Sequence, residues 1–166
     1  MVNDQDPIIQ IDLQLQQLRL LHGTDCVACY AVSTASNGPG ERAGSECTPC
    51  GLHRIRLKIG EGLPENSVFI GRRPTGERYT PELAAANPGR DWILSRILWL
   101  SGLEPGKNRG GRVDSLRRFI YIHGTPDFEP MGQAASHGCI RMRNKELMEL
   151  FNRVSVGTVV DIREHF

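Results

Sequence analysis

The sequence lacks the features that mark nucleic-acid-binding, membrane-spanning and secreted chains. Its 20 basic and 19 acidic residues leave a net charge of +1, so no charge excess indicates nucleic acid or an anionic membrane as a partner. No apolar run approaches the roughly 20 residues that a membrane-spanning helix needs. Residues 1–7 are polar and acidic, without the cationic and apolar regions of a secretory signal. We therefore expect a cytoplasmic protein, or a periplasmic one if a leader was removed.

The pattern of apolar residues favours strands over most of the chain. The 166 residues suit one domain with a hydrophobic core, without internal repeats, so we expect a single domain over 1–166. Alternation with a period of two predicts strands over 9–15 and 53–59, and residues 18–21 are expected to continue the first of these. Further strands are expected over 26–33, 67–71, 92–100, 117–122 and 158–163. The expected fold is mainly β, a sandwich or open barrel with two helices.

Both helices have recognisable start signals. Thr80 followed by Pro81 predicts the first turn of a short helix that ends before Pro88. Asn144 is the expected N-cap of a longer helix, whose apolar residues recur at the spacing of one buried face. The short helix falls in the proline-rich segment 61–111. We interpret this segment as an insertion that forms a lid over a cleft, with a surface loop as the alternative.

Reactive residues are concentrated in Ser136-His137-Gly138-Cys139-Ile140-Arg141 and in His123-Gly124 upstream. A thiol has a reference pKa near ~8.5, so a nucleophilic cysteine needs an imidazole to take its proton. His123 ends a predicted strand, and the Gly124 carbonyl can hold its Nδ1 proton, which leaves Nε2 free. The pattern predicts Cys139 as nucleophile and His123 as its base.

The residues around Cys139 have two interpretations each. The Gly138 and Cys139 amides can form an oxyanion hole. His137 either donates to the oxyanion or bonds a carbonyl with no chemical role. Arg141 either grips a substrate carboxylate in bidentate fashion or forms an ordinary salt bridge.

These motifs resemble the L,D-transpeptidases, the YkuD-type catalytic domains that act on peptidoglycan stem peptides. The family pattern is a histidine, a loop, and then Ser/Thr-His-Gly-Cys with an arginine, which matches His123 and residues 136–141. The resemblance extends upstream through Val32-Ser33-Thr34, Asn37-Gly38-Pro39-Gly40 and Cys47-Thr48-Pro49-x-Gly51-x-His53. It covers roughly residues 30–162 and implies an L,D-transpeptidase-like fold.

The resemblance also implies a reaction. Cys139 attacks the third residue of a stem peptide and expels the terminal D-alanine. His123 acts as the base, and the Gly124 carbonyl orients its ring. In such an enzyme His137 and Gly138 stabilise the oxyanion, and Arg141 and Ser136 bind the substrate. Carbapenems act as covalent inhibitors. No metal or organic cofactor is implied. For a cytoplasmic member we expect L,D-carboxypeptidase trimming of recycled muropeptides, and the alternative is 3→3 cross-linking by an exported enzyme.

Two cysteine pairs support a rival interpretation. Cys26-x-x-Cys29 and Cys47-x-x-Cys50 have the spacing of a zinc site, which would make the chain a zinc-stapled binding module. Against zinc, Cys26 and Cys29 fall in a predicted strand, where residues three apart point to opposite faces. Free thiols are the preferred interpretation, and a redox pair is a further alternative. We expect the other cleft candidates to be core residues, namely Tyr79, Trp92, Arg96 and Trp99.

Overall fold

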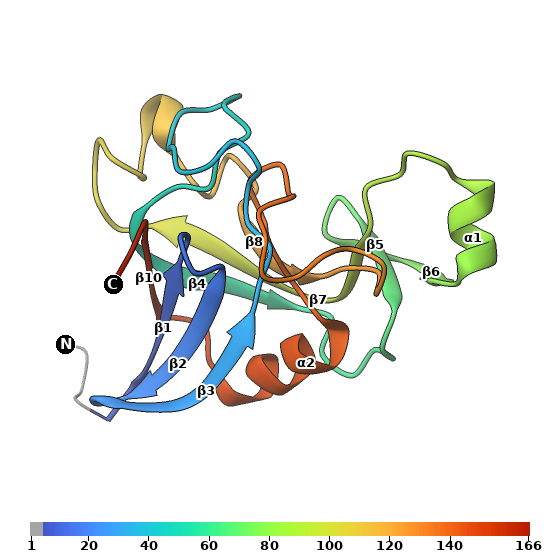
Figure 1. Ribbon diagram of the computed structural model, residues 1–166, viewed down its shortest axis with the longest axis horizontal. Helices are drawn as coiled ribbons and strands as arrows, with labels where there is room; N and C mark the ends of the chain where they lie inside the picture. The colour runs from blue at the N-terminus through green and yellow to red at the C-terminus, as the bar shows by residue number, and fades with distance from the viewer. Residues whose placement is uncertain (1–4) are drawn as a thin grey trace.

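The computed structural model describes residues 5–166, so the first four residues of the interpreted N-terminal stretch lie outside the described residues. It contains strands and two α-helices (Figure 1), with the bounds β1 Pro7–Asp12, β2 Gln17–His22, β3 Asp25–Ala31, β4 Gly51–Ile59, β5 Ser67–Ile70, β6 Arg73–Arg78, α1 Pro81–Ala86, β7 Ile93–Gly102, β8 Tyr121–Gly124, β9 Ile140–Met142, α2 Asn144–Arg153 and β10 Val159–Arg163.

The strands form one open mixed sheet. Its main path runs β3-β2-β1-β10-β4-β7-β5-β6, and β8 pairs with β7 and β9 beside that path. The β1–β10 and β8–β9 pairs are parallel and the others antiparallel. The mainly β prediction is therefore confirmed. The parallel β8–β9 pair places residues 140–142 beside residues 122–124, and the candidate site forms there.

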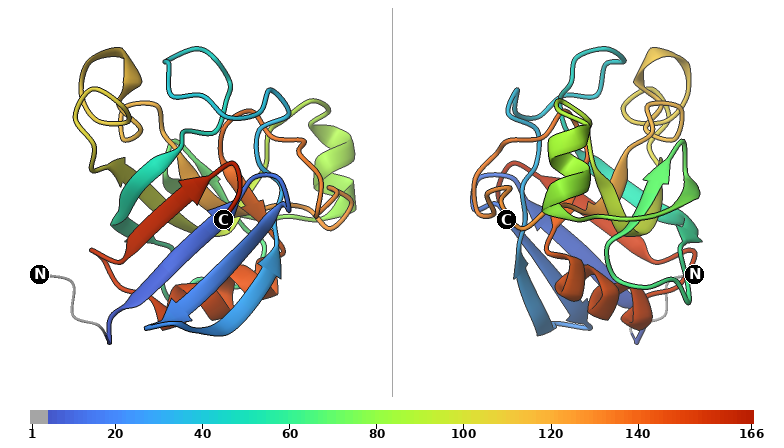
Figure 2. Two further views of the ribbon diagram at one scale, coloured as in Figure 1. Left: turned by 60° about the vertical axis from the view of Figure 1, so that its left-hand side comes forward. Right: turned by 90° about the vertical axis from the view of Figure 1, so that its right-hand side faces the viewer.

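Helix α2 covers one face of the sheet and closes the main core (Figures 1 and 2). Its buried Leu147, Leu150 and Phe151 pack in one cluster with apolar residues from strands across the sheet. Burial of these side chains stabilises the helix at the place where the chain leaves β9. Within residues 5–166, no helix is both long and apolar enough to span a membrane.

The two predicted helix starts have different outcomes. Thr80 caps α1 as predicted, because its side chain accepts from the Leu83 N–H at 3.1 Å and Pro81 begins the helix. The prediction that Asn144 caps α2 is wrong. Arg143 is the cap residue, without a side-chain capping bond, and Asn144 is the first helical residue. Its buried amide is used by neighbouring strands and loops instead.

The predicted insertion over 61–111 consists of two different parts. The β5–β6 hairpin and α1 project from one end of the sheet, at the right of Figure 1. In contrast, β7 pairs with β4, β5 and β8 and is central to the fold. The projecting part therefore ends before Ile93, and β7, which follows it within the range, belongs to the central sheet.

The predicted strands differ from the structure in several places. Residues 18–21 do not continue the first strand but form the antiparallel β2, after a turn in which Gln16 has a positive φ of 50°. Residues 117–120 precede β8 rather than belong to it, because Phe119 adopts a left-handed φ of 57°. Strands β6 and β9 were not predicted, and β9, with three residues, is too short to carry a periodic signal.

Candidate active site

Parallel pairing of β8 with β9 brings His123 and Cys139 into one region. His123 lies opposite Arg141 in the register, and Cys139 immediately precedes β9. The backbone N–H of Tyr121 points to the Cys139 sulfur at 3.4 Å. His123 therefore lies two residues along β8 from Tyr121, the residue whose N–H contacts the Cys139 sulfur.

The His123 ring is buried and held in one tautomer. Its Nδ1 lies 2.7 Å from the Gly124 carbonyl oxygen, which only accepts hydrogen bonds, so Nδ1 carries the proton. This is the hydrogen bond that the sequence predicted. Burial lowers the pKa of His123, and the Gly124 carbonyl partly opposes that effect. The ring is therefore neutral near pH 7, with an unprotonated Nε2.

Gly124 is required by its surroundings. A Cβ at this position would collide with Oδ1 of Asn144 and with the carbonyl oxygen of Leu94. Oδ1 of Asn144 also accepts from the Ser95 hydroxyl at 2.7 Å, and Nδ2 of Asn144 donates to the Thr125 carbonyl at 3.0 Å. This brace fixes the backbone immediately after His123.

The Cys139 thiol is half-buried and uncharged. Its sulfur donates to the Phe119 carbonyl at 3.3 Å. Desolvation among packed side chains raises the pKa of Cys139 to about 11, and the Tyr121 N–H and nearby arginines only partly offset this. The expected thiolate is thus not the resting form. The thiol hydrogen is therefore directed at the Phe119 carbonyl in this arrangement.

The turn before Cys139 is organised by hydroxyl groups. The Ser136 hydroxyl donates to the Cys139 carbonyl at 2.6 Å and accepts from the Gly138 N–H at 3.3 Å. Thr48 donates to the Gly138 carbonyl at 2.9 Å. Because Ser136 is 1% exposed, we assign it to holding the turn rather than to substrate contact. The Gly138 N–H is likewise already engaged, which leaves the Cys139 amide and His137 as the remaining predicted oxyanion donors.

Of the two predicted polar residues beside Cys139, His137 is exposed and Arg141 is buried. His137 is exposed beside the turn. Arg141 is 7% exposed and forms ion pairs with Asp91 and Glu129, both at 3.4 Å, plus a bond to the Ala135 carbonyl at 3.2 Å. Its predicted grip on a substrate carboxylate therefore competes with two protein carboxylates, and the salt-bridge alternative describes the structure.

Several residues of the site belong to no recognisable sequence motif and were not predicted as site residues. Asp91, 62% exposed at its side chain, raises the pKa of both His123 and Cys139 through its charge. Trp99 and Tyr121 belong to the apolar cluster against which Cys139 packs. The prediction that Trp99 is only a core residue was therefore incomplete. Single aromatic residues in strands give no signal that separates a core position from a site wall.

The two cysteine pairs do not converge. Cys26 and Cys29 lie exposed on the edge strand β3, whereas Cys47 and Cys50 lie in the loop that leads into β4. Among residues 5–166 no three His, Cys, Asp or Glu side chains gather in a metal-binding cluster. The four-cysteine zinc arrangement is therefore not formed in the described chain.

Contrary to the expectation from strand periodicity, Cys26 and Cys29 do not point to opposite faces of the sheet. Cys26 pairs with Leu21 and Cys29 with Arg19, because a bulge in β3 adds one residue between them. Residues two apart in β2 share a face, so both thiols lie on the same face of the sheet. Consistent with this proximity, burial and the charge of Cys26 both raise the pKa of Cys29.

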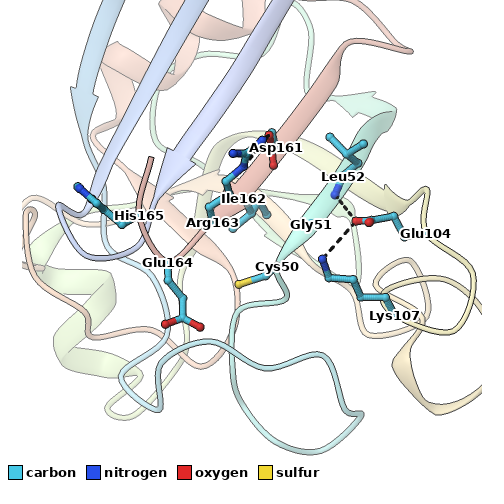
Figure 3. Close-up of a pocket in the computed structure, with 10 residues that line it drawn as sticks. All are labelled: Cys50, Gly51, Leu52, Glu104, Lys107, Asp161, Ile162, Arg163, Glu164 and His165. Carbon is cyan, nitrogen blue, oxygen red and sulfur yellow. Dashed lines mark hydrogen bonds and ion pairs between the residues drawn. The ribbon is translucent and has the colours of Figure 1, made fainter.

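A mixed-charge hollow of about 480 Å³ lies outside this site (Figure 3). None of the predicted site residues lines it. Its thiol belongs to Cys50, whose pKa is raised to about 11 by burial and by the nearby Glu41 carboxylate. Glu104 is already bonded to the Leu52 N–H and paired with Lys107 (Figure 3). The thiol in this hollow is therefore protonated near pH 7.

Comparison of the sequence with models of known protein families identifies the family of this chain. The model of the YkuD L,D-transpeptidase catalytic domain matches residues 6–162. The chain belongs to the L,D-transpeptidase family. Among curated relatives of this L,D-transpeptidase domain, a Bacillus subtilis protein named putative L,D-transpeptidase YqjB is 28% identical over 160 residues, which cover 96% of this chain and 72% of that protein.

Solved L,D-transpeptidases share the fold. One from Mycobacterium smegmatis matches with a TM-score of 0.60 and 14% identity, covering 95% of this chain and 58% of that chain. L,D-transpeptidase 3 from Mycobacterium tuberculosis, solved with a faropenem-derived adduct, matches with a TM-score of 0.57 and 14% identity, over 95% of this chain and 60% of that one. This L,D-transpeptidase domain thus spans less than two thirds of either solved chain.

Proposed function

We propose that this L,D-transpeptidase domain is a cysteine acyl-transferase that acts on peptidoglycan tetrapeptides. The Cys139 sulfur attacks the carbonyl carbon of the third stem residue, and the thiol proton passes to Nε2 of His123. The bond to the fourth residue breaks, the leaving D-alanine amine takes that proton, and a thioester remains on Cys139. The observation that carries the proposal is the 2.7 Å bond from Nδ1 to the Gly124 carbonyl, which reserves Nε2 for the thiol proton.

The neutral resting forms of Cys139 and His123 define how the base acts. Burial raises the pKa of Cys139 to about 11 and lowers that of His123, so a resting thiolate–imidazolium pair is disfavoured. His123 therefore acts as a general base during the attack rather than by storing a thiolate beforehand. In this mechanism the thiol gives up its hydrogen bond to the Phe119 carbonyl as its proton passes to Nε2 of His123.

Water is the acceptor that we propose for the second half of the reaction. Cys139 is half-buried and His137 is exposed, so solvent reaches the edge of the site. Water attack on the thioester releases a tripeptide acid and restores the thiol. The protein is then an L,D-carboxypeptidase that trims muropeptides, and cross-linking is the alternative in which an amine replaces water. Action in the cytoplasm is part of this proposal.

The acceptor is tested with purified protein and a disaccharide tetrapeptide. Release of disaccharide tripeptide and free D-alanine in equal amounts supports trimming. Cross-linked dimers as the sole product reject water as the acceptor, although they retain the acyl-transfer step. A reaction without either product rejects the acyl-transferase proposal itself.

The nucleophile and base are tested with imipenem and intact-protein mass spectrometry. We expect one covalent adduct on the wild type and none on Cys139→Ala. His123→Ala is expected to form the adduct roughly 10²–10⁴-fold more slowly, the range typical of general-base loss. A Cys26→Ala variant is the matched control, since this thiol lies on the edge strand β3. An unchanged rate in His123→Ala removes His123 from the mechanism.

A further inference from the structure

Arg72 occupies an unusual position in the projecting hairpin. Ile70 pairs with Arg73, so Gly71 and Arg72 form a two-residue turn between β5 and β6, with φ values of 53° and 67°. Such turns favour Gly and Asn, and a left-handed conformation costs an ordinary L-residue roughly 1–2 kcal/mol. A residue held in this conformation needs interactions elsewhere to offset that cost.

The Arg72 side chain reaches a wall of three aromatic residues, Trp99, Phe119 and Tyr121. Its guanidinium carbon lies 4.7 Å from the ring centres of both Trp99 and Phe119. Its Nη1 donates to the Tyr121 hydroxyl at 3.0 Å. The rings also contact one another, with Trp99 edge-on to Tyr121 at 5.8 Å between centres. Cation–π contacts on two rings and one hydrogen bond fix the orientation of the guanidinium.

This aromatic wall adjoins the nucleophile. The Phe119 carbonyl and the Tyr121 N–H are the two groups hydrogen-bonded to the Cys139 sulfur, at 3.3 and 3.4 Å. Cys139 packs in the same apolar cluster as Trp99 and Tyr121. Phe119 is 49% exposed, so the wall has a solvent-facing side. Arg72 therefore brings a positive charge from the hairpin to residues that directly contact the sulfur.

Three arginines lie near this region, and two of them are already engaged. Arg141 is neutralised by Asp91 and Glu129. Arg118 donates to the carbonyls of Gly40 and Cys47 and to the Ser45 hydroxyl. Within residues 5–166, no carboxylate forms an ion pair with Arg72, and its Nε and Nη2 groups have no hydrogen-bond partner. An oriented guanidinium with unused donors is suited to bind a carboxylate in bidentate fashion.

We propose that Arg72 is a specificity-determining residue that binds a carboxylate of the donor stem peptide. The inference rests on the proposed function, which supplies the peptide as substrate. Two carboxylates fit this chemistry, the C-terminal one of D-alanine and the side-chain one of a diaminopimelate at the third position. Aromatic stacking presents the guanidinium on the wall formed by Trp99, Phe119 and Tyr121, which Cys139 also contacts, so a peptide bound there has its carboxylate at Arg72 and its reacting carbonyl near the sulfur. Substrates that lack the contacted carboxylate are discriminated against.

Three peptides distinguish the two sources. They are a tetrapeptide with diaminopimelate, the same peptide with a C-terminal amide, and a tetrapeptide with lysine at the third position. We expect Arg72→Gln to raise KM roughly 10- to 100-fold for the peptide that carries the contacted carboxylate, with a smaller change in kcat. The penalty should disappear for the one peptide that lacks this group. Arg72→Lys should recover part of the loss, and the exposed neighbour Arg73→Gln should change neither constant.

A binding measurement separates this inference from the proposed reaction. Calorimetry of the same peptides with Cys139→Ala, with and without Arg72→Gln, reports recognition without turnover. Carboxylate-dependent binding that Arg72→Gln removes supports the inference even if the wild type releases no D-alanine, a result that would reject the reaction alone. Equal effects of Arg72→Gln on all three peptides, or no effect, overturn the inference. Thermal melting of Arg72→Gln checks that the variant is folded.

Discussion

The Ser95 hydroxyl donates to Oδ1 of Asn144 at 2.7 Å and thereby joins a bulge of β7 to the first turn of α2. Ser95 is fully buried and has a positive φ of 69°, which an L-residue adopts only when its surroundings hold it there. The Asn144 amide also bonds the Thr125 carbonyl. Gly124 lies between these groups, so the brace determines where the His123 ring is placed.

Replacement of Asn144 by alanine should therefore damage both stability and activity. The variant leaves the buried Ser95 hydroxyl and the Thr125 carbonyl without this partner, and we expect a loss of about 2 kcal/mol in the free energy of unfolding. Imipenem acylation should slow as well, because the backbone after His123 is released. Denaturant melts and adduct kinetics measure the two effects. The exposed Asn152→Ala on the same helix is the control, and equal behaviour of both variants contradicts the role of the brace.

The Ser136 hydroxyl should matter through the turn that it holds. Ser136→Ala removes the bonds to the Gly138 N–H and the Cys139 carbonyl, and we expect roughly a 10-fold slower acylation with about 1 kcal/mol of lost stability. Ser136→Thr retains the hydroxyl and should stay close to the wild type. If the alanine variant changed substrate KM alone while the acylation rate held, the substrate-binding role first predicted for Ser136 would be restored.

The alkylation of Cys139 should depend steeply on pH. Because desolvation raises the pKa of this thiol to about 11, the reactive thiolate fraction grows about tenfold per pH unit through pH 9. We expect the iodoacetamide rate at Cys139, followed by peptide mapping, to rise over this range without a plateau. A free cysteine thiol in a small peptide provides the reference, because its rate begins to level off once the pH passes its lower pKa of about 8.5. A plateau below pH 7 at Cys139 would demonstrate a resting thiolate–imidazolium pair.

Acid should destabilise the protein through His53. Burial lowers the pKa of His53 to about 4, while its Nδ1 bonds the Gly51 carbonyl and its Nε2 accepts from the Ser115 hydroxyl. The unfolded chain binds this proton near pH 6.5 and the folded chain only near pH 4. Stability is therefore fully present above pH 6.5 and declines between 6.5 and 4, by about 3 kcal/mol.

Denaturant unfolding at several pH values tests the contribution of His53. The difference in stability between the wild type and His53→Gln should narrow as the pH falls from 6.5 to 4. Comparison with the variant removes the shared contribution of the carboxylates. A difference that stays constant over this range would show that His53 is not held neutral by the fold.

Much of the chemistry was readable from short-range sequence features. The fold class followed from period-two alternation, the start of α1 from Thr80-Pro81, and the family from the spacing of His123 and residues 136–141. Even the bond between Nδ1 of His123 and the Gly124 carbonyl was predictable, because it joins adjacent residues. Local geometry and hydrophobic periodicity are properties of neighbouring residues, so the sequence alone contains them.

Only the tertiary structure decided which polar groups of the candidate site are free to contact a substrate and which are bonded within the protein. The engagement of Arg141 by Asp91, the burial of Ser136 and the approach of Arg72 to Tyr121 join segments distant in the sequence. The same holds for the pKa of Cys139, which depends on the side chains that desolvate the sulfur. Such contacts are set by strand register and by bulges, in which one extra residue moves a side chain to the other face. The sequence by itself therefore determined which groups we propose to react, and the packing of the folded chain decided their protonation, their hydrogen-bond partners and their accessibility.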